Sequence, residues 1–174
     1  MTYSLSTSEL KEKANTLHVG DRVLLSGVVY TARDAAHKRF MALLDEGKEL
    51  PFDINGACIY YCGPTPTKEG RAIGSAGPTT SSRMDPFTPR LLGLGLAATL
   101  GKGARSSAVN EALKQNGAVY FAAIGGAGAL YSKCITSCEA VAFADLGCES
   151  VKRLTLKDFP VIVATDCFGE TLYK

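Results

Sequence analysis

The sequence has few of the features that mark membrane, secreted or nucleic-acid-binding proteins. Its 174 residues contain no tryptophan, and the net charge of +2 is too small to suggest a nucleic-acid or anionic-membrane partner. The longest weakly polar stretch, residues 91–100, is half the length of a membrane span and contains two glycines. The first twenty residues have neither an apolar signal core nor an arginine-rich transit pattern. We therefore expect a soluble, cytoplasmic protein.

The six cysteines do not form a recognisable metal or disulfide motif. They are Cys58, Cys62, Cys134, Cys138, Cys148 and Cys167. Without a secretion signal a disulfide framework is not expected. The first two are separated by a strand-like run, in which residues four apart lie far from each other, and no C-x2-C motif accompanies the others. We expect free thiols packed as small hydrophobic groups, with a metal or cluster site as the alternative.

Strand and helix patterns alternate along the chain. Apolar, β-branched runs predict strands over residues 22–30, 57–61, 97–100, 118–124, 139–144, 152–156 and 160–165. Helical spacing and capping residues predict helices over 34–44, 88–94, 106–115 and 128–133. Asp34 and Thr88 are the expected caps of the first two helices. Because the last strands follow one another without long helices, we predict one α/β domain, residues 1–174, with a mixed sheet.

Glycine-rich motifs do not indicate nucleotide binding. Residues 93–98 have the letters of a dinucleotide fingerprint but lie late in a predicted helix, whereas that fingerprint must open one. Residues 124–128 follow a strand, yet Tyr131 takes the place of the third glycine. The G-K-G at residues 101–103 lacks the upstream glycine of a phosphate-binding loop.

Cations follow three of the predicted strand ends or turns. They are Arg33, Arg83 and Lys102. Ligands of open α/β sheets bind at strand ends, and guanidinium and ammonium groups bind carboxylates through charge-assisted hydrogen bonds. The loop of residues 63–82 adds hydroxyl and backbone N–H donors, and loops of this length are commonly functional. The pattern predicts a small-anion site, the alternative being solvated surface cations, and His37 nearby is more often structural than catalytic.

Six segments follow one another in an order that resembles a known family. They are T-A-R-D-A-A-H-K-R (31–39), I-Y-Y-C-G-P (59–64), G-P-T-T-S-S-R-M-D (77–85), G-K-G (101–103), I-G-G (124–126) and D-F-P (158–160). This set is similar to the β subunit, or C-terminal domain, of class I fumarases and of the related L-tartrate dehydratases. The resemblance covers residues 5–174 and implies a swivelling β/β/α domain.

The resemblance also implies a division of labour between two parts of an enzyme. In this family three cysteines of the α part hold a [4Fe–4S] cluster, and those motifs are absent here, so this chain is expected to bind no cluster or other metal. Arg33, Arg83 and Lys102 would bind the substrate carboxylates. Thr79 would exchange the carbon-bound proton, with Thr80 beside it, and the carboxylate that activates Thr79 is expected from the α part.

The resulting hypothesis is the β subunit of an iron–sulfur-dependent hydro-lyase. It would interconvert fumarate and malate, and only when joined to a separate, cluster-bearing α subunit. A heteromer of α and β is expected, or a homodimer of the isolated chain. Fumarate is preferred because R-D-A-A-H-K-R and S-S-R-M-D look closer to the fumarase form. The β subunit of L-tartrate dehydratase and a non-catalytic small-anion-binding module are the alternatives.

Overall fold

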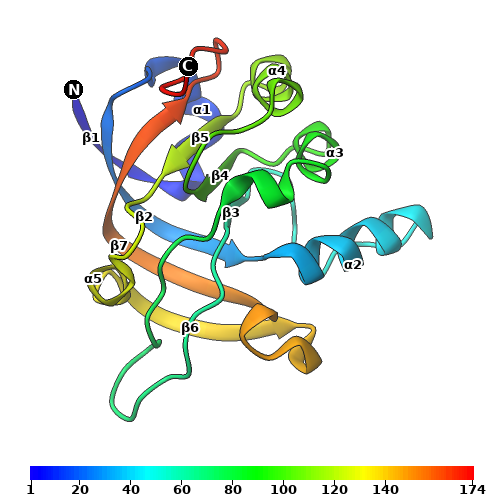
Figure 1. The fold of residues 1–174 in the computed structure, drawn as a ribbon, viewed down its shortest axis with the longest axis vertical. Helices are drawn as coiled ribbons and strands as arrows, with labels where there is room; N and C mark the ends of the chain where they lie inside the picture. Colours follow the sequence, from blue (N-terminus) through cyan, green and yellow to red (C-terminus); the bar gives the residue numbers. More distant parts are fainter.

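Seven strands form one mixed sheet that curls into a small barrel in the computed structural model (Figure 1). The strands are β1 (Thr2–Ser6), β2 (Arg22–Thr31), β3 (Cys58–Tyr60), β4 (Ala98–Gly101), β5 (Val119–Ala122), β6 (Ile135–Ala142) and β7 (Val151–Thr165). Their order is β1-β2-β3-β4-β5-β7-β6, and an additional pairing of β2 with β7 closes the barrel. The prediction of a single α/β domain with a mixed sheet is confirmed.

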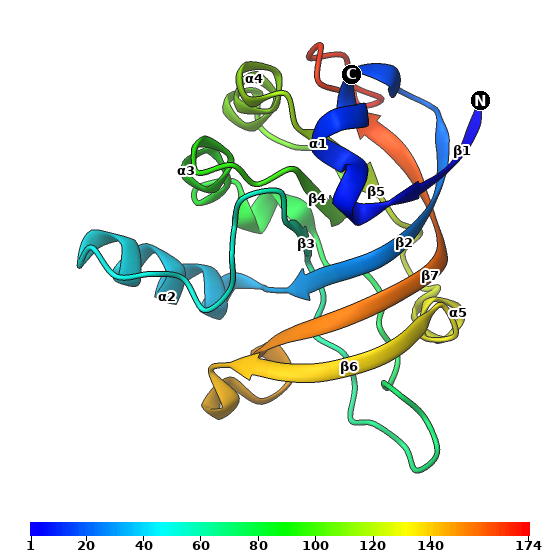
Figure 2. The same ribbon diagram turned by 180° about the vertical axis from the view of Figure 1, so that it is seen from behind.

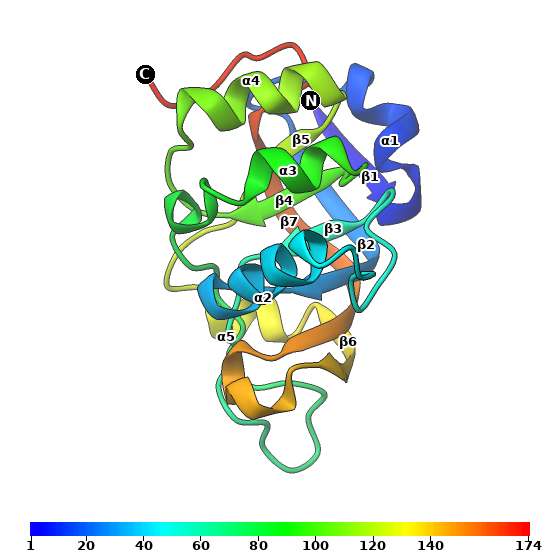
Figure 3. The same ribbon diagram turned by 90° about the vertical axis from the view of Figure 1, so that its right-hand side faces the viewer.

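Three of the helices cover one side of the barrel. The α-helices are α1 (Leu10–Lys13), α2 (Asp34–Asp45), α3 (Thr88–Gly93), α4 (Ser107–Asn116) and α5 (Gly128–Ser132). The 3-10 helices are η1 (Thr7–Glu9), η2 (Ala14–Thr16), η3 (Ser81–Met84) and η4 (Ala144–Glu149). Figure 3 shows α2, α3 and α4 side by side against the sheet, whereas α1 lies beside β1 (Figure 2). None of these helices has the length and apolar character that a membrane crossing requires.

Alternating side chains of the central strands fill two cores. In β5, Val119 and Phe121 point into the barrel, and Tyr120 between them packs under the helices. In β3, Tyr60 points into the barrel and Ile59 faces the helix side. Because both faces of these strands are buried, their sequences are almost continuously apolar, as expected for parallel strands covered on both sides.

The direction of the strands decides where the loops meet. Strands β1 to β5 are parallel, whereas β7 runs antiparallel to β2, β5 and β6. The carboxyl ends of β2, β3, β4 and β5 therefore lie at one edge of the sheet. The long loop between β3 and η3 leaves this edge, extends past β6 and returns to it (Figure 1).

The predicted helix positions are confirmed, although two of the predicted caps are wrong. Helix α4 begins after the N-cap Ser106, whose side chain accepts from the backbone of Val109, and it ends at the left-handed Gly117. Asp34 is the first residue of α2 and makes no capping hydrogen bond, because Arg33 occupies the N-cap position. At α3 the N-cap is likewise one residue earlier than predicted, and the Thr88 hydroxyl donates to a backbone carbonyl of the preceding turn instead.

Two strand predictions differ from the structure. The runs predicted as separate strands over 152–156 and 160–165 are one continuous strand, β7, because the D-F-P segment does not turn the chain. Asp158 there adopts a positive φ of 49°, and the pairing with β2 is irregular at this point, where Lys157 and Asp158 lie opposite Ser26 alone. Strand β6 begins at Ile135, four residues earlier than predicted. Neither β1 nor α1 was predicted.

Candidate functional site

The loops after the parallel strands meet at one edge of the sheet. The Tyr61 N–H donates to the Leu100 carbonyl at 2.8 Å, and the Ala123 N–H donates to the Gly101 carbonyl at 2.8 Å. These bonds continue the strand pairing beyond β3, β4 and β5, so that the following residues are held in fixed positions. This edge is where ligands of parallel α/β sheets bind.

Both predicted threonines and Lys102 lie together on this edge. The Thr79 N–H donates to the Tyr61 carbonyl at 2.8 Å. Thr80 pairs with Lys102 in an isolated parallel β-bridge, and the Ser81 N–H donates to the Lys102 carbonyl at 2.9 Å. The returning loop is thus attached to the G-K-G turn. The Lys102 side chain is partly exposed, and its ammonium group makes no ion pair or hydrogen bond within the chain, so its charge is available to an anion.

Arg33 lies just after the end of β2, beside Gly63 in the segment that follows β3. Its guanidinium packs over Gly63, where a Cβ would lie 3.0 Å from Nη1, so a larger residue would displace it. The Arg33 side chain is 25% exposed, and Nε lies 3.8 Å from Glu149 Oε1. The two groups form an ion pair at that distance, but they are too far apart for a hydrogen bond. The N–H donors of the guanidinium therefore remain available to a carboxylate ligand.

Arg83 is placed near this edge, on the segment that follows Thr79 and Thr80. It lies in η3, two residues after Ser81, and its side chain is exposed with no hydrogen bond or ion pair. The structure therefore brings Arg33, Thr79, Thr80 and Lys102 to the ends of adjacent strands, and it places Arg83 on the segment that follows directly.

A buried arginine that the sequence reasoning missed supports the whole edge. Arg105 Nε–H donates to Asp85 Oδ1 at 2.7 Å, and its Nη1 donates to Thr99 Oγ1 at 3.0 Å. Its Nη2 donates to the Tyr61 hydroxyl at 3.1 Å and to Thr88 Oγ1 at 2.9 Å. Burial alone would lower the pKa of Arg105, but Tyr61 and the Asp85 carboxylate outweigh it and raise the pKa.

The Arg105 network joins the loops of this edge to the sheet. Its guanidinium lies 4.9 Å from the centre of the Tyr120 ring. The hydroxyl of Tyr120 accepts from Ser81 Oγ at 2.8 Å and donates to the Gly103 carbonyl at 2.7 Å. Asp85 also accepts from a backbone N–H at the start of α4, so both of its carboxylate oxygens are engaged within the chain. The only local signal for Arg105 was a cation directly before a helix cap.

His37 lies in the interior of the domain and not at its surface. It is fully buried, and its Nδ1–H donates to the Arg33 carbonyl at 2.8 Å. Its ring packs against the rings of Phe40, Tyr61 and Phe87. Burial lowers the pKa of the imidazole to about 4, so His37 is neutral at physiological pH and cannot contact a substrate.

The cysteines do not fit the ligand set that an iron–sulfur cluster requires. Cluster ligands are thiolates, whereas burial raises the pKa of both Cys58 and Cys62 to about 12. No three side chains of His, Cys, Asp or Glu converge on one point. All six cysteines are free thiols, and Cys58 and Cys62 pack in the barrel core.

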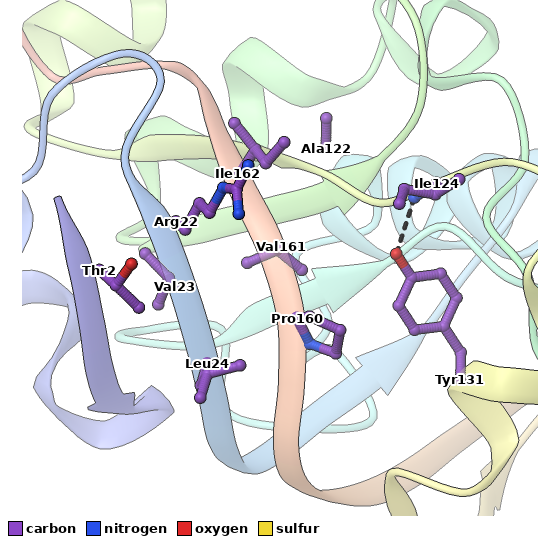
Figure 4. Close-up of a pocket in the computed structure, with 10 residues that line it drawn as sticks. All are labelled: Thr2, Arg22, Val23, Leu24, Ala122, Ile124, Tyr131, Pro160, Val161 and Ile162. Carbon is purple, nitrogen blue, oxygen red and sulfur yellow. Dashed lines mark hydrogen bonds between the residues drawn. The ribbon is translucent and has the colours of Figure 1, made fainter.

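A separate hollow of about 460 Å³ is lined mainly by β2 and β7, together with Ala122 at the end of β5 and Ile124 just after it (Figure 4). Seven of its ten lining residues are apolar, and its one cation is Arg22. The Tyr131 hydroxyl accepts from the Ile124 N–H at 2.8 Å at its rim. None of the predicted site residues lines it, and its apolar walls do not suit a small dianion.

Fold and site together define an α/β barrel domain that presents cations and hydroxyls at the ends of parallel strands. A model described as the fumarase C-terminus matches residues 2–174. The chain is 38% identical over 168 residues to fumarate hydratase 2 of Leishmania major, and 36% identical over 168 residues to the aerobic class I fumarate hydratase of Escherichia coli K12. It is also 38% identical over 170 residues to a protein named "Putative L(+)-tartrate dehydratase subunit beta" of Methanocaldococcus jannaschii.

The extent of these matches differs between the two kinds of relative. Both fumarate hydratases match over 95% of this chain, but the chain spans only 30% and 31% of their length. The Methanocaldococcus protein matches over 94% of this chain and 87% of its own length. The chain belongs to the fumarase C-terminus family, which confirms the resemblance drawn from the six sequence segments.

Proposed function

We propose that this chain is the β subunit of a hydro-lyase that reversibly hydrates fumarate to malate together with a separate, cluster-bearing α subunit. The observation that carries the proposal is the placement of Arg33, Thr79, Thr80 and Lys102 at the ends of adjacent parallel strands. Membership of the fumarase C-terminus family supports the reaction class. The subunit arrangement, a heteromer of α and β, is supported by the match to most of a protein named as a β subunit.

The cations of the edge bind the substrate carboxylates in this proposal. A dicarboxylate needs a fixed positive charge near each end, and Arg33 and Lys102 leave the ends of two different strands, β2 and β4. Arg83 adds a third charge from η3. Fixed cations of this kind orient the substrate and stabilise the negative charge that develops when a proton leaves carbon.

Thr79 moves the carbon-bound proton, and it needs help to do so. A threonine hydroxyl is a poor base unless a neighbouring group takes its proton in turn. Asp85 is unsuited to that task because its two oxygens accept from Arg105 and from the backbone of Ser106. We therefore assign the activating carboxylate to the α subunit. This assignment explains why the active site would be divided between two chains. Thr80, held in the bridge to Lys102, lies beside Thr79 and fixes its position.

The cluster itself is assigned to the α subunit. The side chains of this chain do not fit a cluster, because Cys58 and Cys62 are buried thiols and no other group of suitable ligands converges. The contribution of this chain is therefore carboxylate binding and proton transfer.

Tartrate is the alternative substrate, favoured by the match to 87% of the Methanocaldococcus protein. The second hydroxyl of tartrate needs a polar partner, and an unpaired hydroxyl costs about 1–3 kcal/mol on burial. The two hydroxyls assigned to this site, those of Thr79 and Thr80, already have other roles in the proposal, and fumarate needs no such partner. Comparing kcat/KM for fumarate hydration and L-tartrate dehydration tests the choice, and a preference for tartrate would reverse it.

The cation assignment is tested by single alanine variants in the assembled enzyme. Arg33→Ala, Arg83→Ala and Lys102→Ala should each lower kcat/KM by at least about thirtyfold, since losing a buried partner of a charged ligand costs 2 kcal/mol or more. Arg39→Ala is the matched control, because Arg39 lies on the surface of α2 and pairs with Asp145. Near-normal kcat/KM in all four variants would contradict the assignment of this edge as the substrate site.

A further inference from the structure

Three buried side-chain polar atoms of the chain lack a hydrogen-bond partner, and all three belong to the N-cap or the first turn of α2. They are Arg33 Nε, Asp34 Oδ1 and His37 Nε2. A buried polar atom without a partner costs about 1–3 kcal/mol, and folded proteins contain few of them. Their grouping at the residue proposed to bind substrate indicates that this turn is shaped for a purpose other than stability.

His37 fixes the backbone of Arg33 from the inside of the helix. Arg33 is the N-cap of α2, where its backbone is outside the helix. Its carbonyl accepts both the backbone N–H of His37, at 3.0 Å, and the Nδ1–H of the same residue, at 2.8 Å. Because a carbonyl can only accept, Nδ1 must carry the proton, and the neutral ring then leaves Nε2 as the unpartnered acceptor.

The imidazole also joins the three segments that carry the proposed site residues. Its ring centre lies 5.6 Å from that of Tyr61, whose carbonyl holds Thr79, and 5.7 Å from that of Phe87. Phe87 follows Arg83 on the segment between η3 and α3. A hydrocarbon side chain of similar size could fill the same space, but it could not hold the N-cap carbonyl.

We propose that His37 is a positioning residue, which directs the Arg33 guanidinium at the substrate by holding the Arg33 carbonyl through Nδ1–H. The inference rests on the proposed function, because it assumes that Arg33 binds a substrate carboxylate. His37 is fully buried and acts only through Arg33. A neutral imidazole that donates from Nδ1 necessarily leaves Nε2 unprotonated. Burying Nε2 without a partner is therefore the cost of having a hydrogen-bond donor, and not a hydrocarbon side chain, beneath the Arg33 carbonyl.

Two variants of His37 in the assembled enzyme separate hydrogen bonding from packing. His37→Leu should raise KM for fumarate about tenfold, the effect of one hydrogen bond, and change kcat by less than about twofold. His37→Asn keeps an N–H at the position of Nδ1 and should retain most of the wild-type KM. Equal KM values in both variants, normal or raised, would contradict a role for the Nδ1 hydrogen bond.

A double-mutant cycle shows whether the effect passes through Arg33. Adding His37→Leu to Arg33→Ala should change KM no further, whereas adding it to Arg83→Ala should multiply KM by the same tenfold factor. Equal factors in both backgrounds would mean that His37 acts on packing and overturn the inference. If Arg33→Ala alone has no effect, the proposed substrate site fails instead, so the two failures are distinguishable.

The hydrogen bond can be tested in the wild-type ring without relying on a destabilised variant. The chain has two histidines, so a His18→Gln chain labelled with nitrogen-15 histidine gives the signals of His37 alone. At neutral pH we expect a neutral imidazole with Nδ1 protonated and Nε2 unprotonated. A ring protonated at Nε2 instead would rule out donation to Arg33 and with it the positioning role.

Discussion

Replacing Arg105 should damage the protein more than replacing any surface arginine. Its side chain is fully buried, and that of its partner Asp85 is only 11% exposed. Removing one member of a buried ion pair leaves an uncompensated charge, at a cost of about 3–5 kcal/mol. Arg105→Met keeps most of the side-chain volume, so that the measured loss reports on charge and hydrogen bonding. We expect a decrease of that size in the free energy of unfolding.

Urea unfolding followed by circular dichroism measures this decrease. Arg39→Met is the matched control, because Arg39 and Asp145 also form a two-point ion pair, but with side chains 40% and 66% exposed. An exposed pair of this kind contributes about 1 kcal/mol or less. Adding Asp85→Leu to Arg105→Met should recover part of the stability, since no buried charge is left unpaired. A loss below about 1 kcal/mol for Arg105→Met would refute the reasoning.

Further predictions concern acid stability, loop attachment and cluster binding. Burial lowers the pKa of His37 from 6.5 to about 4 in the folded state. As the pH falls, the unfolded chain therefore binds a proton at this residue before the folded chain does, and the free energy of unfolding should decrease by about 2 kcal/mol from pH 7.5 to pH 5. Urea titrations of His37→Asn should lack that part of the decrease. Gly101→Ala should destabilise by about 1–3 kcal/mol, because its Cβ would lie 2.0 Å from Ser81 Oγ, whereas Gly93→Ala, with open space around it, should not. Anaerobic reconstitution of the isolated chain with iron and sulfide should give no stoichiometric cluster absorbance; an absorbance that Cys58→Ser abolishes would overturn the assignment of the cluster to the partner.

Elements with local signals could be predicted from the sequence, and those that depend on distant partners could not. Helix α4 has a serine cap at one end and a left-handed glycine at the other, both within its own residues. Strand β1 has little apolar pattern, with only Leu5 buried, and it exists because it pairs with β2. The continuity of β7 depends likewise on pairing with β2, β5 and β6. From the sequence alone, its D-F-P segment resembled a turn between two strands.

The same distinction applies to the site. Arg33 and Lys102 could be predicted because the ends of parallel strands meet whatever the loops contain. Arg105 could not, because its burial depends on Asp85, Thr99 and Tyr61, which come from three other segments. In the sequence a buried arginine of this kind is indistinguishable from a solvated one, and the same is true of the hydrogen bond that ties His37 to Arg33.

The exchange of the malate C3 proton tests the central claim most directly, because it isolates the step assigned to this chain. In the assembled enzyme in deuterated water, Thr79→Val should abolish both turnover and exchange, whereas Thr79→Ser should keep part of each. Thr80→Val should be milder, since that residue only neighbours the reacting group. If Thr79→Val weakens substrate binding but leaves kcat and exchange nearly intact, Thr79 merely binds a carboxylate, and the account of proton transfer by this chain is wrong.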